Sequence, residues 1–412
     1  MILSAAAEKG PRLQALDGLR GVAALLVVLL HVEWPNHLTE NNFVQHGYVA
    51  VDLFFILSGL VIASNYSHRI ANLREAKSFI GLRLFRLYPL HLAMIGAFLF
   101  LECAKLFAQR AFGIMAGPQI PFTGSESFGA LAANVFLING LHVLKGPAWN
   151  GASWSISCEL AAYLVFSMVA LTGLLRSRLF FLAGSLIAVA SYAALALERG
   201  TLDVTVDWGI IRCLAGFFLG MLTYQFNRRD ILGQSRILIG ACGIAVTIAV
   251  VLTMAFGSGP LIAFVIPLFV IAIALLQFDQ GLIAHLLISP VAQFLGRISY
   301  SIYMVHGFLV VCLLIILKRV FVLSTALNPI REYPIVVINP WIGDLLVVGL
   351  VVFVVAAASA TYTFIEEPGR LLGRRLFANS RSRTSTLIYS PDKHEDRFVK
   401  NPGDVLAVSS RR

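Results

Sequence analysis

Long apolar stretches separated by short polar segments dominate the pattern of hydrophobic and polar positions along this chain. Each stretch approaches the ~20 residues that an α-helix needs to cross the hydrocarbon core of a bilayer. They predict membrane spans at 18–34, 47–65, 87–106, 153–174, 179–197, 208–226, 237–256, 260–277, 298–317 and 342–364. The pattern therefore predicts an all-α fold, a polytopic transmembrane helical bundle of about ten spans.

One further apolar stretch, 129–144, is short and contains Asn134 and Asn139. We expect it to be a re-entrant or interfacial segment, with an eleventh span as the alternative. The basic residues favour the first interpretation. If the N-terminus is placed in the cytoplasm, most Lys and Arg residues of the connecting segments lie on the inner side, as the positive-inside rule requires. The C-terminus is then cytoplasmic as well, and an eleventh span would break this alternation.

The composition agrees with a membrane protein, because 58% of the residues are hydrophobic and only 13% are charged. The net charge of +10 is accounted for by basic cytoplasmic loops, so it does not call for a nucleic-acid partner. The five cysteines all fall in apolar segments without a CxxC pair, which predicts that they serve as small hydrophobic residues and not as a disulfide framework or a metal site. We expect a transmembrane domain over 1–375 and a polar, disordered cytoplasmic tail over 376–412.

Ionisable residues inside a span are costly and usually face a protein interior or a wet cavity. Arg20 and His31 lie eleven residues apart in the first span, which is three helical turns plus roughly 20°, so they share one face about 16 Å apart. Asp52 and Glu159 are predicted at a similar depth to His31 on two other spans. A neutral histidine can accept a proton from a hydroxyl, and a carboxylate can orient its ring. Catalysis by His31, Glu159 and Asp52 is therefore the sharper hypothesis.

Structural roles are the alternatives for these three residues. His31 alone is also typical of a packing group bonded across helices, and Asp52 of an acceptor for backbone or hydroxyl donors. Glu159 has a possible partner in Arg212, with which it would form a stabilising ion pair.

A second candidate site is basic. Arg83 and Arg86 have i,i+3 spacing and share a helix face at the predicted cytoplasmic entrance to the third span. Guanidinium groups suit phosphate oxygens, so these two residues, with Arg20 nearby, would form a port for a phosphate-bearing ligand. The alternative is that they bind anionic lipid headgroups.

Six other residues are candidates for lining a cavity around these groups, namely Asp17, Trp154, Ser155, Tyr300, Tyr303 and His306. Asp17 is expected to cap the first span, and the start of the ninth span carries Tyr300, Tyr303 and His306 at three-residue spacing. Tyrosines at the start of a span are also typical of the interfacial aromatic belt.

Six runs in order make the chain similar to the acyltransferase-3 family of bacterial membrane O-acyltransferases. They are LDGLRGVAALLVVLLH (16–31), GYVAVDLFFILSGLVI (47–62), FIGLRLFRLYPLH (79–91), SWSISCELAAYL (153–164), LGRISYSIYMVHG (295–307) and TFIEEPGR (363–370). The resemblance implies an enzyme of the bacterial inner membrane. Such enzymes carry an acyl group, often acetyl, from cytoplasmic acyl-CoA to a hydroxyl of a saccharide or lipid-linked glycan at the outer face.

The resemblance also assigns roles. The family's arginine-x10-histidine motif falls on Arg20 and His31, its arginine-x-x-arginine motif on Arg83 and Arg86, and its tryptophan-serine…glutamate motif on Trp154, Ser155 and Glu159. His31 is then the expected catalytic residue, and the arginines are expected to bind the donor. The chain departs from many relatives at Leu160, where a second acidic residue is usual. Some relatives carry an added SGNH hydrolase domain, which we do not expect here.

Acyl-CoA, most simply acetyl-CoA, is thus expected as a co-substrate, with no bound cofactor or metal and with membrane lipids as surroundings. A proton-coupled transporter is the rival function, since intramembrane His, Asp and Glu mark such carriers too. No inverted repeat or pair of broken helices supports it. A non-catalytic scaffold is a third class, disfavoured by the many charged positions inside spans.

Overall fold

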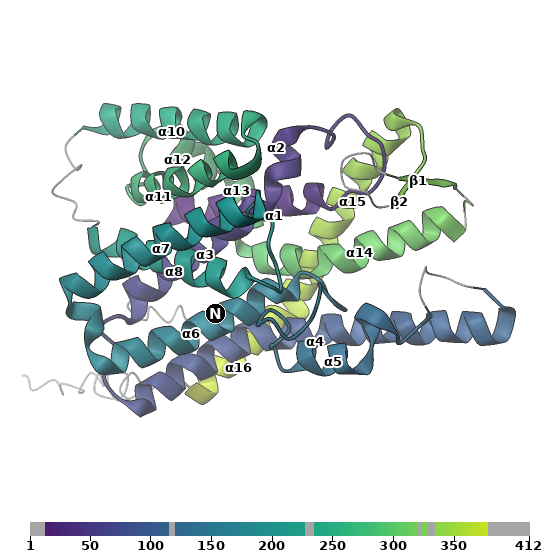
Figure 1. The fold of residues 1–412 in the computed structure, drawn as a ribbon, viewed down its shortest axis with the longest axis horizontal. Helices are drawn as coiled ribbons and strands as arrows, with labels where there is room; N and C mark the ends of the chain where they lie inside the picture. The colour runs from purple at the N-terminus through teal and green to yellow at the C-terminus, as the bar shows by residue number, and fades with distance from the viewer. Residues whose placement is uncertain are drawn as a thin grey trace, which may run out of the picture. The chain divides into compact units, whose positions relative to one another are not determined.

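The computed structural model describes residues 13–114, 120–226, 235–319, 321, 323–327 and 334–377, and these form a helical bundle (Figure 1). The helices of the first half are α1 Gln14–Leu30, α2 Asn42–Gln45, η1 His46–Val49, α3 Ala50–Tyr66, α4 Leu73–Phe112, η2 Gly124–Glu126, α5 Phe128–Val135, α6 Ser153–Thr172, η3 Leu174–Arg176 and α7 Arg178–Arg199. Those of the second half are α8 Gly209–Phe226, α10 Arg236–Phe256, η4 Gly259–Phe264, α11 Val265–Leu276, α12 Gly281–Ile288, α13 Pro290–Arg297, α14 Ser299–Arg319, α15 Pro340–Thr361, the π-helical turn η5 Tyr362–Glu366, and α16 Glu367–Phe377.

Two three-residue strands complete the described elements. β1 Thr325–Leu327 and β2 Pro334–Val336 pair antiparallel, with Ala326 opposite Ile335. The prediction of an all-α bundle is therefore confirmed apart from this small ribbon.

Eight helical segments of the described chain are long and apolar enough to span a membrane. They are Asn42–Tyr66, Leu73–Phe112, Ser153–Thr172, Arg178–Arg199, Arg236–Phe256, Gly259–Leu276, Ser299–Arg319 and Pro340–Phe377. The two other predicted spans, 18–34 and 208–226, correspond to α1 and α8. α1 has 17 residues, and the apolar part of α8, Gly209–Gln225, is equally short. The protein is an integral membrane protein, while ten spans and cytoplasmic termini stay predictions.

The stretch 129–144 is not a membrane-spanning helix. α5 has eight residues, about 12 Å of helix, against the ~30 Å of a hydrocarbon core, and irregular backbone follows from 136 to 152. The non-spanning interpretation of this stretch thus agrees with the structure. The predicted tail, 376–412, lies outside the described residues except for its first two positions.

α4 and the last helix extend well beyond the predicted spans. α4 is one helix of 40 residues, and its N-terminus is capped by the Asn72 side chain, which accepts a hydrogen bond from the Glu75 amide. Hydropathy detects only the apolar part of a helix, so this polar extension was missed. The extension carries Arg83 and Arg86, so a rigid helix positions both.

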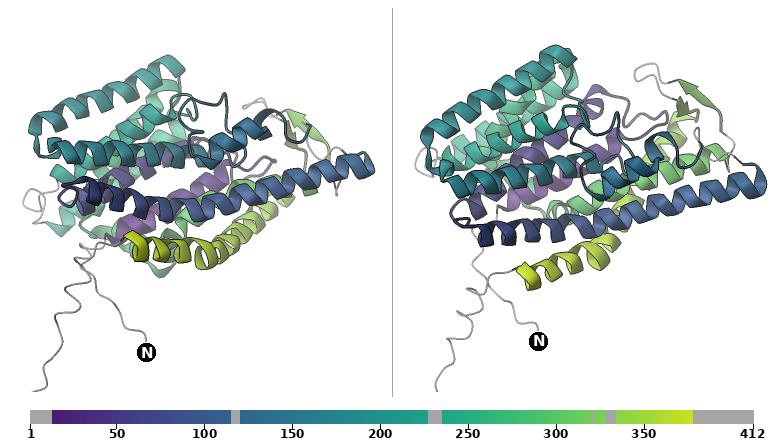
Figure 2. Two further views of the ribbon diagram at one scale, coloured as in Figure 1. Left: turned by 90° about the horizontal axis from the view of Figure 1, so that it is seen from below. Right: turned by 60° about the horizontal axis from the view of Figure 1, so that its bottom comes forward.

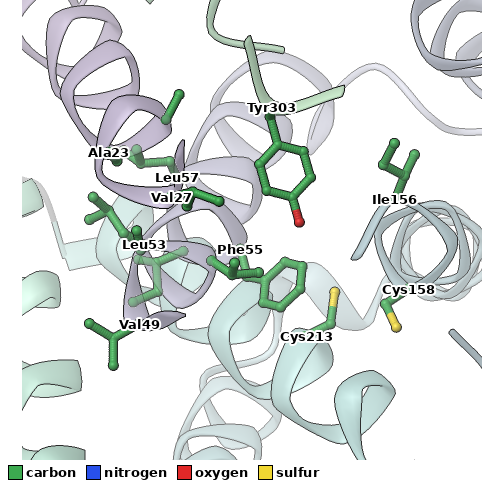
Figure 3. Packing of buried hydrophobic residues seen from close by; sticks show 14 of the residues in the cluster. Ala23, Val27, Val49, Leu53, Phe55, Leu57, Ile156, Cys158, Cys213 and Tyr303 are labelled. Carbon is green, nitrogen blue, oxygen red and sulfur yellow. The ribbon is translucent and has the colours of Figure 1, made fainter. Parts of the chain in front are cut away.

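Close packing of small residues joins the helices that surround the site. A Cβ atom on Gly59 of α3 would lie 1.9 Å from the Phe217 carbonyl oxygen of α8, and one on Gly220 would lie 1.9 Å from that of Ile56. Glycines allow backbones in membranes to approach in this way. Figure 3 shows the buried core beside this contact, where Phe55 of α3 lies near Cys213 of α8 and Cys158 of α6. All five cysteines are free, and of these Cys158 and Cys213 are buried.

Candidate active site

His31 directly follows the last residue of α1 and is exposed. Its Nδ1 lies 2.8 Å from the Val27 carbonyl oxygen, one helical turn earlier. A carbonyl oxygen can only accept a hydrogen bond, so Nδ1 of the neutral ring carries the hydrogen and donates it. The lone pair is then on Nε2. The backbone of α1 therefore orients the ring and sets its tautomer, whereas a carboxylate was expected to orient it.

A second imidazole from α14 packs against this one. The ring centroids of His31 and His306 are 4.8 Å apart, with the ring planes at 61°. His306 is 1% exposed, and its Nδ1 donates to the Tyr303 carbonyl oxygen at 2.7 Å. The Tyr303 hydroxyl is 2.8 Å from Oγ of Ser155. The structure thus brings together four of the predicted residues, from α1, α6 and α14.

Asp52 is engaged elsewhere. Its side chain is fully buried, and both of its carboxylate oxygens accept hydrogen bonds from Arg212, at 2.8 Å from Nε and 2.6 Å from Nη2. The Tyr192 hydroxyl donates to the same carboxylate at 2.9 Å. Arg212 also donates to the carbonyl oxygens of Tyr48 and Val204, which ties α8 to η1 and to the loop before α8. The structural alternative left open for Asp52 is the one that this geometry favours.

Arg212 therefore takes Asp52 as its partner, whereas an ion pair with Glu159 was the alternative derived from the sequence. Its guanidinium carbon also lies 5.8 Å from the ring centroid of Trp154. Trp154 is 6% exposed and precedes Ser155, so the ion pair supports the start of α6 next to the two imidazoles.

Glu159 accepts hydrogen bonds from the hydroxyls of Ser58 and Tyr163. Ser58 follows Asp52 by six residues on α3, which is about 9 Å along the helix axis. The expectation that Asp52 and Glu159 share a depth is therefore corrected. Counting residues from the start of each helix neglects that α3 and α6 begin at different heights. Arg20 and Arg86 are charged neighbours of Glu159.

Three arginines form a cluster at this level, Arg20 from α1 and Arg83 and Arg86 from α4. Nη2 of Arg83 donates to the Tyr66 hydroxyl at 2.8 Å, and its guanidinium lies 5.1 Å from the Tyr66 ring centroid. Across the described ranges, no carboxylate lies within ion-pairing distance of any of the three, and Nε of Arg83 is buried without a hydrogen bond. Such a cluster suits an anionic ligand.

The start of α1 differs from the sequence expectation. α1 begins at Gln14, so Asp17 lies within its first turn and is not the N-cap. The cap comes from outside the helix, because the carboxylate of Asp279 accepts the Ala15 amide at 2.9 Å. Asp17 is a charged neighbour of Arg20. A long-range cap of this kind leaves no local sequence signal.

Tyr300 connects α14 to the arginine-bearing helix, since its hydroxyl donates to the Leu87 carbonyl oxygen at 2.7 Å. Sequence reasoning missed Ser58 and Tyr163, although the i,i+4 spacing of Tyr163 from Glu159 was a usable signal. Within the residues that the structure describes, no group of three or more His, Cys, Asp or Glu side chains is arranged to hold a metal ion.

Comparison with known proteins gives matches over most of the chain. A family model described as an acyltransferase domain, acyltransferase-3, matches residues 13–361. The putative membrane-bound transacylase BcsY of Komagataeibacter xylinus is 25% identical over 303 residues, 72% of each chain. Acyltransferase MdmB of Streptomyces mycarofaciens is 30% identical over 168 residues, 38% of this chain and 39% of MdmB.

A third relative is longer than this chain. O-acetyltransferase OatA of Staphylococcus aureus is 25% identical over 400 residues, which cover 89% of this chain and 58% of OatA. No solved structure gives a significant match.

Proposed function

Because this chain belongs to the acyltransferase-3 family of membrane acyltransferases, we propose that it moves an acyl group, most simply acetyl, from cytoplasmic acyl-CoA to a hydroxyl of a saccharide or lipid-linked glycan at the outer face of the membrane. The observation that carries the proposal is that α1 presents an arginine near its start and a histidine at its end. Arg20 joins an arginine cluster that makes no ion pair with a carboxylate of the described residues, and His31, eleven residues later, presents an imidazole whose tautomer is fixed.

The donor binds through its phosphates. Arg20, Arg83 and Arg86 offer guanidinium forks that match phosphate oxygens, and their location on two rigid helices keeps the cost of ordering them low. The predicted topology places this cluster toward the cytoplasm. The pantetheine arm then runs between the helices and brings the thioester toward His31, about 16 Å along α1 from Arg20.

His31 performs the chemistry with the lone pair on Nε2. In one route Nε2 accepts the proton of the acceptor hydroxyl while the oxygen attacks the thioester carbonyl, the carbon–sulfur bond breaks, and the imidazolium returns the proton to the departing thiolate. In the other, Nε2 attacks the thioester carbonyl, the carbon–sulfur bond breaks and the thiolate departs. The resulting acyl-imidazolium then passes its acyl group to the acceptor hydroxyl, whose proton neutralises the thiolate. Both routes need the same tautomer, and neither needs a metal or a bound cofactor.

The relatives support an acyl acceptor with a hydroxyl group, because one of them is named an O-acetyltransferase. His31 is exposed at the end of α1, so an acceptor can reach it from the side of the bundle where α1 ends. The predicted topology assigns that side to the outer face of a bacterial inner membrane.

The test is transfer of label from radiolabelled acetyl-CoA to extractable glycan or lipid, with membranes that contain the full chain. Wild type is expected to transfer label, and His31→Ala to abolish transfer while it inserts and is produced normally. His285→Ala is the matched control, since His285 is an exposed histidine whose Nδ1 likewise lies close to a carbonyl oxygen one turn earlier, that of Gly281, at 2.7 Å. Retained transfer in His31→Ala would remove this residue from the mechanism, and solute flux without label would favour a carrier.

A further inference from the structure

The joint between α15 and α16 places a carboxylate, Glu366, inside the bundle. The helix widens into a π turn over Tyr362–Glu366 and continues as α16 with Pro368 in its first turn. Proline removes an amide donor and crowds the preceding turn, which explains an irregularity here. π turns are rare and occur frequently at functional sites. Glu366 is 5% exposed, and its Oε2 accepts a hydrogen bond from the Ser301 hydroxyl at 2.7 Å.

Two glycines dock this segment on the helix that carries the donor-site arginines. A Cβ atom on Gly369 would lie 2.4 Å from Cγ of Pro89, and one on Gly373 would lie 2.4 Å from Cβ of Phe85. Arg86 lies between these two partners on α4. Figure 2 shows α16 running alongside α4 in both views. Glu366 precedes Gly369 by three residues and Gly373 by seven, so all three share the face of the helix that meets α4.

The charged residues around Glu366 indicate which guanidinium groups its carboxylate interacts with. Its charged neighbours are Arg86, Arg370 and Arg20. Arg370 already forms an ion pair with Glu367, on the more exposed side of α16. Glu366 therefore acts on the two arginines of the proposed donor site. It does so from beyond ion-pairing distance, and at such a range a charge inside a bundle is still felt strongly, because water does not screen it.

We infer that Glu366 is a positioning residue of the donor site, one that orients Arg86 and Arg20 for the phosphates of the acyl donor. The inference rests on the proposed function. The Ser301 hydroxyl fixes the carboxylate, and the π turn and the two glycine contacts fix the segment. Within the part of the chain that the structure describes, the guanidinium groups of Arg86 and Arg20 make no direct ion pair. The arginines are thereby ordered while their forks remain available to phosphate oxygens.

The experiment compares Glu366→Gln with Glu367→Gln in the full-length protein reconstituted in nanodiscs. The two substitutions are identical and adjacent, but Glu367 pairs with Arg370. Glu366→Gln is expected to raise the KM for acetyl-CoA about tenfold and to change kcat less than about threefold. The reason is that the substitution weakens the charged hydrogen bonds between the arginines and the donor phosphates, whereas the chemistry at His31 is unaffected. Glu367→Gln is expected to match wild type, and Glu366→Asp to recover part of the loss.

A donor without phosphates separates positioning from general structural damage. Acetyl-pantetheine has no phosphates for the arginines to bind. Glu366→Gln and wild type are therefore expected to have the same KM for this donor. If Glu366→Gln does not fold, Ser301→Ala serves instead, because it removes only the hydroxyl that fixes the carboxylate, and it should raise the KM for acetyl-CoA about threefold.

Three results would overturn the inference. The first is a KM for acetyl-CoA in Glu366→Gln, or in Ser301→Ala if that variant is used, within about twofold of wild type. The second is an equal effect of Glu367→Gln, and the third is an equal effect on acetyl-pantetheine. If wild type itself neither turns over acetyl-CoA nor binds coenzyme A in a calorimetric titration, the proposed function fails and the inference fails with it.

Discussion

Asp52 of α3 and Arg212 of α8 form a fully buried ion pair in which both carboxylate oxygens accept hydrogen bonds from the guanidinium group. Removing one member of such a pair leaves the other charge buried without compensation, which costs about 3–5 kcal/mol. We therefore expect Asp52→Asn to lower the thermal unfolding temperature of the detergent-solubilised protein markedly. Asp207→Asn is the control, because Asp207 pairs with Arg199 at the surface, where ion pairs contribute about 1 kcal/mol or less.

The same variant separates the two roles considered for Asp52. A structural role predicts that Asp52→Asn protein which remains folded at low temperature still transfers acyl groups. If instead the variant is as stable as Asp207→Asn but inactive, Asp52 takes part in the chemistry.

Removing the Tyr303 hydroxyl should slow acyl transfer without weakening donor binding. This hydroxyl bonds to Ser155, and the Tyr303 ring lies 5.8 Å from that of His306, which packs on His31. We expect Tyr303→Phe to lower kcat about tenfold at an unchanged KM for acyl-CoA, because Tyr303 loses the neutral hydrogen bond to Ser155 that holds its ring beside His306. Tyr88→Phe, on α4, is the comparison, and steady-state kinetics of both variants decide. A change confined to the donor KM would refute the placement of Tyr303 beside the reacting groups.

Substitution of Arg83 should affect the donor alone. We expect Arg83→Ala to raise the apparent KM for acyl-CoA about tenfold, as loss of a charged hydrogen bond to phosphate implies, with the acceptor KM unchanged. Arg178→Ala at the start of α7 controls for a general loss of positive charge. A shift in the acceptor KM alone would show that the arginine cluster serves another ligand.

Gly59 should tolerate no side chain. A Cβ atom there would lie 1.9 Å from the Phe217 carbonyl oxygen, so Gly59→Ala must separate α3 from α8 at a cost of about 1–3 kcal/mol or more. A Cβ atom on Gly96 of α4 meets no described residue within 4 Å, so Gly96→Ala should be neutral or stabilising by up to about 1 kcal/mol. Unfolding temperatures in detergent test both, and equal values would contradict this packing.

Long apolar runs were enough to predict the helical class and the approximate place of most helices, because a helix that crosses a bilayer needs such a run. They underestimated α4 and the last helix, whose polar extensions are helical through tertiary contacts and capping. The shared face of Arg20 and His31 followed from helix geometry alone, and the structure shows each residue meeting a different part of the site.

The relative positions of the helices, and the contacts that follow from them, could not be predicted from the sequence. Arg212 pairs with Asp52 rather than with Glu159 because of the relative heights of α3, α6 and α8. No local sequence pattern encodes these heights. The tautomer of His31 depends on where α1 ends, a boundary that apolar periodicity leaves uncertain by a turn. The inward position of Glu366 depends on a π turn, which shifts every later side chain around the helix.

Because an α-helix has a fixed rise per residue, α1 fixes the axial distance between the residues at its two ends. Its first turn is held by the Asp279 carboxylate, and just beyond its end the indole of Trp34 donates to the Gly343 carbonyl oxygen. The axial rise along α1 from the backbone of Arg20 to that of His31 is thereby held at about 16 Å. This fixed rise selects acyl donors by the length of the arm between their phosphates and their thioester. A shorter or longer arm would place the thioester carbon away from His31.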